Sequence, residues 1–442
     1  MARRHPKRQI EKIAASIRQF GFLNPLLIDD TEAVIAGLAR LAAAKHLLMT
    51  TVPVIVASHL TPAEKRAYVL AENRLAELGE WDRDILGEEL RELKILDRDF
   101  ELELIGFEPI ELDNLTRLKT NANLDKVPAP PLVPVTERGD HWELGDHRTL
   151  MGDALNPADV ALLMGSGKAR AAFLDAPYNV PIVGHVTKNA AHREFQMAVG
   201  ELSATGFTEF LTTAHRNVAN HVMDGGLIYS CMDWRHAENM LDAQRAAALG
   251  LVNICIWTKP QAGQGSFYRS QHEFVFVFKC GTAQHFNSIQ LGRHGRSRSN
   301  VWAYQGVSGL VRESRVAHAQ HPTPKSVTMT EDALLDCTEK GDLVIDVFGG
   351  GGTTLMAAER IGRRARLLEI APEYVDVIVE RWQSFTGRQA TLAGTGLTFA
   401  QVRAQRAEVR ARSPMPFAPA PHQPPPAVRI RTRAVTATSE GA

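Results

Sequence analysis

Four consecutive glycines, residues 349–352, constrain this chain more than any other feature. They follow an apolar run that ends in Asp346, and they precede a run of good helix formers from Thr353 to Arg360 that contains no breaker. This order predicts a strand, a tight turn and a helix. Glycines let the backbone approach a ligand closely, and a helix N-terminus directs unpaired N–H groups at it. We therefore expect an α/β fold whose glycine turn holds a ligand.

The next predicted strand, residues 366–370, narrows the kind of ligand. It carries Glu369 about twenty residues after the glycine turn, where nucleotide-binding α/β folds place a carboxylate on ribose hydroxyls. The complete dinucleotide fingerprint needs a third glycine inside the helix, but position 355 is Leu, and no phosphate-loop Gly-Lys-Ser/Thr follows. The pattern favours a nucleoside-bearing cofactor, and a generic glycine turn without a ligand is the alternative.

Length and composition set the outer limits. A chain of 442 residues accommodates two or three domains, and its formal net charge of zero means that a nucleic-acid partner must be met by a local basic patch. The four cysteines are far apart and form no Cys-x-x-Cys, which argues against a structural metal site or a disulfide framework and for a reducing, cytoplasmic setting. No signal peptide or apolar run of membrane-spanning length is evident.

Residues 1–112 are predicted to form a first unit. The apolar positions of residues 10–17 follow a helical period, two short strands (26–30 and 33–36) form a hairpin, and Gly37 turns the chain into a helix. A strand over 52–56 and a helical pattern over 62–96 follow.

This unit resembles the ParB/sulfiredoxin-like N-terminal domain, which has a small α+β fold. Gly37 and Arg40 match the family's Gly-x-x-Arg motif, although Leu38 replaces the histidine that often follows the glycine. The resemblance implies that the Gly37–Arg40 loop binds a phosphate-bearing ligand. The alternative is that Arg40 only caps or pairs locally.

Residues 113–139, rich in proline, are predicted to be a stiff linker, and a second unit spans 140–399. It begins with a hairpin over 142–153 and a helix over 157–163. An apolar strand then ends in Asp175-Ala176-Pro177-Tyr178, which alone is an ordinary end of a strand. Further strands are expected at 226–230, 252–259 and 274–279.

Taken together, the Asp346-x-Phe348-x-Gly350-x-Gly352-Thr353 and Asp175-Ala-Pro-Tyr178 motifs resemble those of the β-group of amino DNA methyltransferases. In that group the catalytic half precedes the cofactor half, as Asp175 precedes Asp346 here. The resemblance implies an S-adenosylmethionine-dependent methyltransferase fold, Rossmann-like, with a mostly parallel sheet and a circularly permuted motif order. Later motifs of the group are matched by Trp257-x-Lys259, by residues 268–273 and by residues 321–325.

The resemblance also assigns roles to individual residues. Asp175 and the carbonyl of Ala176 would accept the amine hydrogens of the target base, Pro177 would fix the turn, and Tyr178 would stack on the base. S-adenosyl-L-methionine would be bound by Asp346, Phe348, Gly350, Gly352, Thr353, Glu369, Asp153 and Lys325. Asp153 could equally be a turn acid, and Lys325 could be a surface lysine.

Double-stranded DNA is the implied partner, with a homodimer left open, and the target base would be flipped out of the helix. A target-recognition segment is expected at about 285–325, where basic residues greatly outnumber acidic ones. The predicted DNA-binding residues are Arg293, Arg296, Arg298, Arg269 and His272. A solvated basic face is the alternative. Residues 400–442 are predicted to be a short basic helix followed by a disordered, proline-rich tail.

The predicted activity is methylation of adenine N6, because members of the group that modify cytosine usually carry Ser in place of Asp175. Methylation of cytosine N4 is the first alternative. The second is a ParB-like DNA-binding or partition protein with a decayed methyltransferase body, since Ala176, Val347 and Ser326 stand where relatives often have proline.

Overall fold

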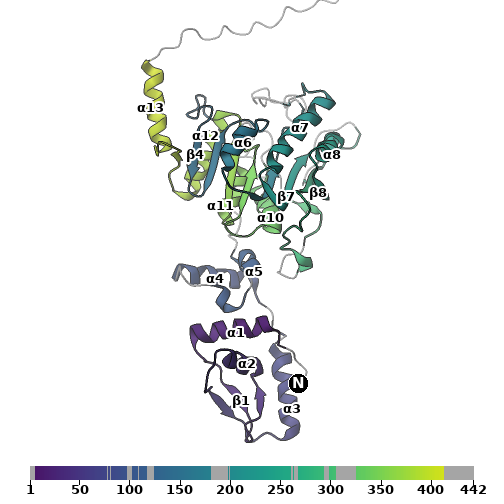
Figure 1. Cartoon of the computed structure of the whole chain (residues 1–442), viewed down its shortest axis with the longest axis vertical. Coiled ribbons are helices and arrows are strands. Elements are labelled where there is room, and N and C mark those ends of the chain that lie inside the picture. Colours follow the sequence, from purple (N-terminus) through teal and green to yellow (C-terminus); the bar gives the residue numbers. More distant parts are fainter. Residues whose placement is uncertain are drawn as a thin grey trace, which may run out of the picture. The chain divides into compact units, whose positions relative to one another are not determined.

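A computed structural model gives the structure of the chain (Figure 1). It describes residues 5–76, 78–79, 81–96, 102–107, 109–116, 124–180, 198, 200–259, 262, 267–292, 298–304 and 325–412. Contacts divide the chain into two compact units, with the boundary between Phe399 and Ala400. No helix within these described ranges is long and apolar enough to cross a membrane.

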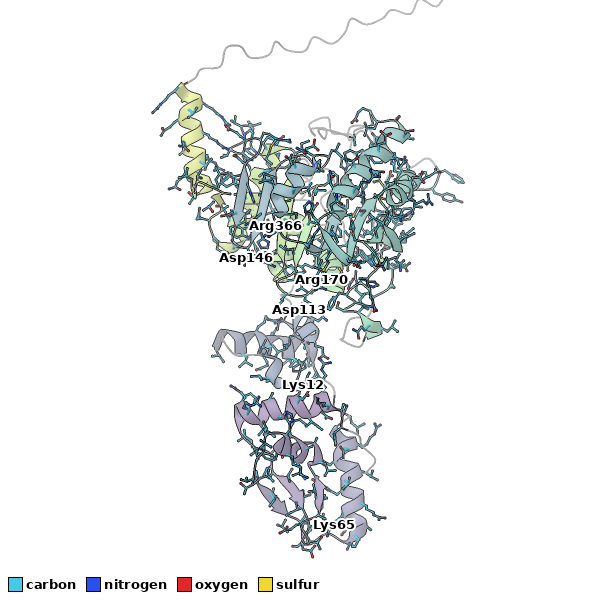
Figure 2. The ribbon with its side chains drawn as sticks, viewed as in Figure 1. Lys12, Lys65, Asp113, Asp146, Arg170 and Arg366 are labelled. Carbon is cyan, nitrogen blue, oxygen red and sulfur yellow. The ribbon has the colours of Figure 1, made fainter. Side chains whose placement is uncertain are left out.

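The N-terminal part contains a three-stranded sheet in the order β2-β1-β3, with β1 antiparallel to β2 and parallel to β3. Its elements are α1 (Lys7–Phe20), β1 (Leu26–Ile28), β2 (Val34–Ala36), α2 (Leu38–His46), β3 (Val54–Val56) and α3 (Pro62–Ala76). Gly37 precedes α2 with φ at 97°. The ammonium of Lys65 in α3, labelled in Figure 2, pairs with Asp29 at 3.1 Å, which ties that helix to the end of β1.

The helical pattern over 62–96 is two helices rather than one. The first helix, α3, ends at Ala76. It is followed by α4 (Arg83–Leu96), the 3₁₀ turn η1 (Leu102–Ile105) and α5 (Pro109–Leu115). Asp82 starts α4, because its side chain accepts the Ile85 N–H at 3.1 Å. The three elements close over a small apolar cluster of their own, formed by Leu90, Leu102, Leu112 and Leu115.

A large mixed sheet dominates the rest of the chain, in the order β10-β8-β9-β7-β6-β11-β12-β5-β4-β13. Its strands are β4 (His141–Leu144), β5 (His147–Met151), β6 (Ala169–Leu174), β7 (Val222–Met232), β8 (Gly250–Thr258), β9 (His272–Lys279), β10 (Val301–Ala303), β11 (Leu343–Asp346), β12 (Arg364–Glu369) and β13 (Thr391–Leu392). The centre, from β7 through β6, β11 and β12 to β5, is parallel. The predicted α/β, mostly parallel fold is confirmed, as are its predicted strands.

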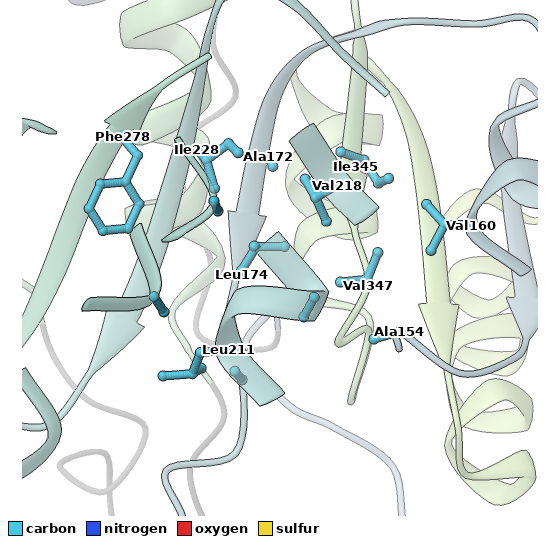
Figure 3. Close-up of a cluster of buried hydrophobic side chains, with 14 of the residues drawn as sticks. Ala154, Val160, Ala172, Leu174, Leu211, Val218, Ile228, Phe278, Ile345 and Val347 are labelled. Carbon is cyan, nitrogen blue, oxygen red and sulfur yellow. The ribbon is translucent and has the colours of Figure 1, made fainter. Parts of the chain in front are cut away.

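Helices cover both faces of this sheet, as expected for parallel strands joined by crossover connections. One set, α6 (Pro157–Met164), α7 (Ala204–Ala219) and α8 (Ala237–Ala246), packs side by side, and so does a second set, α10 (Val327–Cys337), α11 (Thr353–Arg360) and α12 (Pro372–Thr386). Figure 3 shows the core under the first set, in which Leu211 and Val218 of α7 lie over Ala172, Ile228 and Ile345 of the sheet. Short 3₁₀ turns occur at η3 (Trp234–His236) and η4 (Gln290–Gly292).

Residues 124–139, the second half of the predicted linker, are more than a spacer. The backbone N–H groups of Val135 and Thr136 donate to the carboxylate of Asp376 in α12, at 2.6 and 3.0 Å, and the side chains of Leu124 and Val127 are buried. The first half of the predicted linker includes the end of α5. At the other end of the chain, α13 (Phe399–Arg412) is the predicted basic helix, and residues 413–442 lie outside the described part.

Candidate active site

The two turns that the sequence singles out lie at the ends of neighbouring parallel strands. β6 and β11 pair in parallel, with Ala171 opposite Val344 and Ala172 opposite Ile345 (Figure 3). β6 ends immediately before Asp175, and β11 ends at Asp346. At the opposite ends of the same two strands, Arg170, labelled in Figure 2, forms an ion pair with Asp342 at 2.6 Å. Both turns therefore occupy one edge of the sheet, as predicted.

The glycine turn is held by an acid of the next strand. Gly350 and Gly352 have φ of 48° and 80°, in the left-handed region that glycine adopts without strain. Glu369 ends β12; its Oε2 accepts the Gly350 N–H at 2.7 Å and its Oε1 accepts the Ala371 N–H at 2.9 Å. Burial raises the pKa of Glu369 above its ordinary value, against these hydrogen bonds. Each oxygen of this carboxylate keeps a lone pair for a further donor, such as a ribose hydroxyl.

Asp346 begins the turn with a buried carboxylate. It accepts the Phe348 N–H at 3.0 Å and the Thr354 hydroxyl at 2.6 Å, so both of its oxygens are held by the turn that it precedes. Burial raises its pKa to about 7, against these two hydrogen bonds, and the charge of Asp175 adds to the increase. The glycine turn and the Asp175 turn are thus close enough to interact electrostatically.

Asp175 pairs with two residues on one side. Its Oδ1 lies 2.8 Å from the Lys325 ammonium and 3.1 Å from the Tyr178 hydroxyl. Both of these contacts use Oδ1, and 26% of the side chain is exposed. Burial raises the pKa of Asp175, Lys325 opposes this effect, and the nearby charge of Glu273 adds to it. Since the described residues form no hydrogen bond or ion pair with Oδ2, this oxygen can accept an N–H from a ligand.

Lys325 links the two turns. Its ammonium contacts Asp175, whereas its carbonyl accepts the Thr353 hydroxyl at 3.4 Å. The ammonium also lies 5.2 Å from the centre of the Tyr178 ring. The sequence assigns Lys325 to the cofactor; the structure places its backbone against the glycine turn and its charge in the Asp175 cluster.

Glu273, in β9, is a buried acid to which the sequence gives no role. Its carboxylate accepts the Tyr178 hydroxyl at 2.9 Å, lies 3.2 Å from the Lys325 ammonium and also pairs with Lys259. Burial alone would raise its pKa, but Lys325 and Lys259 lower it to about 2. The available sequence signal is an acid at the end of the 268–273 motif and beside an apolar run, which identifies no partner.

Asp153 follows β5, which lies beside β12. The Gly152 N–H donates to the Glu369 carbonyl at 3.0 Å, so Asp153 is at the same edge of the sheet as the glycine turn. Its side chain accepts the Leu155 N–H at 2.9 Å, which is a local turn contact. Both interpretations of Asp153, a cofactor ligand and a turn acid, are compatible with this position.

The structure describes three of the predicted DNA-binding residues, Arg269, His272 and Arg298. The prediction for Arg298 is wrong. Its guanidinium is largely buried, lies 2.9 Å from Asp336 and stacks over Trp302. Arg298 therefore holds β10 against α10 and is not a surface residue that contacts phosphate. Arg293, Arg296 and residues 305–324 lie outside the described residues. His272 begins β9, and Arg269 is exposed and donates to the Ala262 carbonyl at 2.8 Å.

Exposed aromatic side chains lie at the same edge of the sheet as Asp175. β7 runs parallel to β6, and β8 and β9 form a hairpin whose connecting loop lies at the end where β7 finishes. Phe267 and Tyr268 in that loop are 83% and 85% exposed, and Trp234, just after β7, is 50% exposed. Large exposed aromatic rings beside a site are typical of a surface that binds a partner.

The Gly37–Arg40 loop of the N-terminal part forms a separate candidate. The Arg40 guanidinium donates to the Pro25 carbonyl at 3.3 Å, and its Nε is buried without a hydrogen-bond partner among the described residues. A Cβ at Gly37 would come within 2.9 Å of the same guanidinium. The hydrogen bond to Pro25 uses one terminal nitrogen of the Arg40 guanidinium, and Nε is left to donate to an acceptor.

Three family models match successive parts of the chain. They are the ParB N-terminal domain over residues 2–74, the ParB-methyltransferase HTH domain over 84–138, and DNA methylase over 169–380. The middle match spans α4, α5 and most of the predicted linker, and an HTH domain is not among the predictions from sequence.

Individual proteins resemble separate parts of the chain. Over 65 residues, 15% of this chain, it is 48% identical to the ParB-like nuclease domain-containing protein YnaK of Escherichia coli and covers 75% of that protein. Over 142 residues, 30% of this chain, it is 29% identical to the type II methyltransferase M2.DpnII of Streptococcus pneumoniae and spans about half, 52%, of that protein's length. The solved PvuII DNA methyltransferase (cytosine-N4-specific) is 14% identical, with a TM-score of 0.42, over 64% of this chain and 95% of the other.

Proposed function

The chain belongs to the N6/N4 class of DNA methylases, with ParB-type domains in front, and from this premise we propose that it methylates the exocyclic amine of adenine in DNA. Its cofactor is S-adenosyl-L-methionine. The observation that carries the proposal is the pairing of β6 with β11, which sets Asp175 beside the glycine turn.

The cofactor residues fit an adenosyl group. Glu369 ends β12 with a lone pair on each oxygen for the ribose hydroxyls, and the glycine turn lies against the same carboxylate. When bound, S-adenosylmethionine supplies an electrophilic methyl group on its sulfonium. Asp346 and Glu369 would hold the cofactor, with Gly350 and Gly352 keeping the turn open for it.

The Asp175 turn prepares the amine. The lone pair of an exocyclic amine is delocalised into the ring, so the protein must hold the nitrogen in line with the methyl group and strengthen its nucleophilicity with acceptors for its hydrogens. Asp175 Oδ2 and the Ala176 carbonyl supply two acceptors, and Tyr178 supplies a ring for the base to stack on. On accepting the methyl group, the nitrogen would lose a proton. Asp175, whose raised pKa favours protonation, accepts that proton.

DNA is the proposed substrate because the edge that carries Asp175 also carries exposed Trp234, Phe267 and Tyr268 and the exposed Arg269. Rings of this kind stack on bases, and arginine contacts phosphates. Since the amine of a paired base is not accessible to Asp175, the base must leave the helix, and side chains at this edge would occupy the space it vacates.

One experiment tests the activity and the choice of base together. The purified protein is incubated with DNA and S-adenosylmethionine whose methyl group is isotopically labelled, and the digested nucleosides are analysed by mass spectrometry. The proposal predicts label in N6-methyl-2′-deoxyadenosine. Label in N4-methyl-2′-deoxycytidine would overturn the assignment of the base but retain the class of reaction, and unlabelled DNA would overturn the proposed activity.

A further inference from the structure

We propose that Glu273 is a positioning residue for methyl transfer. It shares Lys325 and Tyr178 with Asp175, and this sharing leaves Asp175 free to accept the target amine. The inference rests on the proposed function of the site and gives a role to a residue that the sequence analysis includes only as the last position of the 268–273 motif.

Glu273 connects four parts of the fold at one point. It lies in β9, between β7 and β8 in the sheet, and Trp257 of β8 is its partner in register. Its carboxylate reaches Tyr178 in the turn after β6, Lys325 ahead of α10, and Lys259 just after β8. A carboxylate that is 6% exposed and ties these segments together fixes their relative positions.

The cluster balances two acids against two lysines. Lys325 is within reach of both Asp175, at 2.8 Å, and Glu273, at 3.2 Å. The Tyr178 hydroxyl is 3.1 Å from Asp175 and 2.9 Å from Glu273, but it has one proton and donates to one carboxylate at a time. Because Glu273 takes a share of both donors, Asp175 is only partly neutralised.

Loss of the Glu273 charge would change this balance in a defined direction. Lys325 would then pair with Asp175 alone, which weakens Asp175 as an acceptor and as a base. The pKa of Asp175 would fall, because a nearby negative charge is removed and the attraction of Lys325 is undivided. The groups that face Asp175 from the surrounding elements are Lys325, Glu273, Tyr178, Cys231 of β7 and Asp346 of β11.

The first test is Glu273→Gln, which keeps the size of the side chain and removes its charge. We expect kcat for DNA methylation to fall by up to about 100-fold, since misplacement of a reacting group is costly. Affinity for S-adenosylmethionine should be retained, and the acidic limb of the kcat/KM profile should move to lower pH. Asp224→Asn is the matched control. It removes the charge of a carboxylate that accepts backbone N–H groups near the start of β7, at the edge of the sheet opposite to Asp175.

A second variant separates charge from simple damage to the fold. Lys259→Met removes the other cation that Glu273 binds, so Lys325 is drawn more strongly to Glu273, and the acidic limb should move to higher pH. The proposal is supported if the acidic limb of the kcat/KM profile moves to lower pH in Glu273→Gln and to higher pH in Lys259→Met. An unchanged kcat and pH profile in Glu273→Gln would overturn it, and so would a loss equal to that of Asp224→Asn or an effect confined to the KM for DNA.

A titration without cofactor or DNA distinguishes this proposal from the proposed function. The side-chain carboxyl of Asp175 is followed by ¹³C NMR in aspartate-labelled protein, and its resonance is identified by its loss in Asp175→Asn. A lower midpoint in Glu273→Gln than in the wild type supports the shared cluster even if no DNA is methylated. The same midpoint in both proteins would overturn it whatever the activity.

Discussion

The ionised carboxylate of Asp346 lowers the free energy of unfolding of the protein without ligand. Burial raises its pKa to about 7, whereas an unfolded Asp titrates near 4. Between these two values the folded state binds more protons than the unfolded state, so Asp346 makes the free energy of unfolding decrease as pH rises from about 4 to about 7. Above about pH 7 the contribution of Asp346 to the free energy of unfolding no longer changes with pH. A group kept under such a cost is typical of a functional site.

Asp346→Asn should therefore stabilise the protein without ligand at pH 8. The gain is on the order of 1.4 kcal/mol for each pKa unit, because no charge remains to be buried. The amide oxygen still accepts the Phe348 N–H, and the Thr354 hydroxyl can turn to accept from the amide nitrogen. Chemical denaturation at pH 4 and pH 8 measures the effect, and calorimetry should show weaker binding of S-adenosylmethionine. Equal stability of both proteins at pH 8 would contradict the raised pKa.

For single residues, the sequence identifies those whose position depends only on neighbouring parts of the chain. Asp175, Asp346 and Glu369 each lie at the end of an apolar strand, and the sheet indeed brings their turns to one edge. Glu273 and Arg298 are different, because their environment depends on pairings with residues distant in the chain. An arginine in a basic stretch looks exposed, and only the packing of β10 against α10 reveals that Arg298 is buried.

Among the elements, the glycine turn is the most sensitive to substitution. Gly352 has φ of 80°, and a Cβ there would lie 3.1 Å from Ile378. Gly387, at the end of α12, has φ of 69° but nothing within 4 Å of an added Cβ. The two glycines share the conformational requirement and differ in their surroundings.

Gly352→Ala and Gly387→Ala should each lower the free energy of unfolding by about 1–2 kcal/mol, the cost of a left-handed conformation in a residue with a Cβ. Only Gly352→Ala should also weaken binding of S-adenosylmethionine, because it displaces the turn that begins α11. Thermal unfolding and calorimetry on the two variants measure both quantities. Undiminished cofactor affinity in Gly352→Ala would contradict the assignment of this turn.

Strands and hairpins of the large sheet follow from apolar runs that end in polar residues, and these predictions are confirmed. The division of 62–96 into α3 and α4 is missed, because Gly79 and Asp82 interrupt a pattern that otherwise continues helical. The packing of residues 124–139 is missed as well, because their proline content suggests a spacer. Their burial depends on Asp376, about 240 residues away.

For the whole molecule, the methylase domain and the N-terminal part have cores of their own. The main core around β6, β7 and β11 is formed by residues between Leu150 and Leu368, whereas Ala14, Leu26, Ile35 and Ala43 are buried in the N-terminal part. Since neither described core needs side chains from the other, the two parts should be separable.

Deletion of residues 1–76 should therefore leave kcat close to that of the full chain. We also expect it to increase the KM for DNA, because we propose that the ParB-type N-terminal part contacts DNA as well. Methylation kinetics on one DNA substrate at two salt concentrations measure both constants. The unfolding temperature of the deletion variant is the control for its integrity. A fall in kcat with an unchanged unfolding temperature would contradict the independence of the methylase domain.

The central claim is that the Asp175 turn and the glycine turn act together, with one presenting the amine and the other holding the methyl donor. Asp175→Ala, assayed with labelled S-adenosylmethionine for both cofactor binding and methylation of DNA, tests it most directly. The account predicts that labelled cofactor still binds with the wild-type affinity while transfer of the label to DNA falls to background. Transfer at the wild-type rate in Asp175→Ala would contradict it.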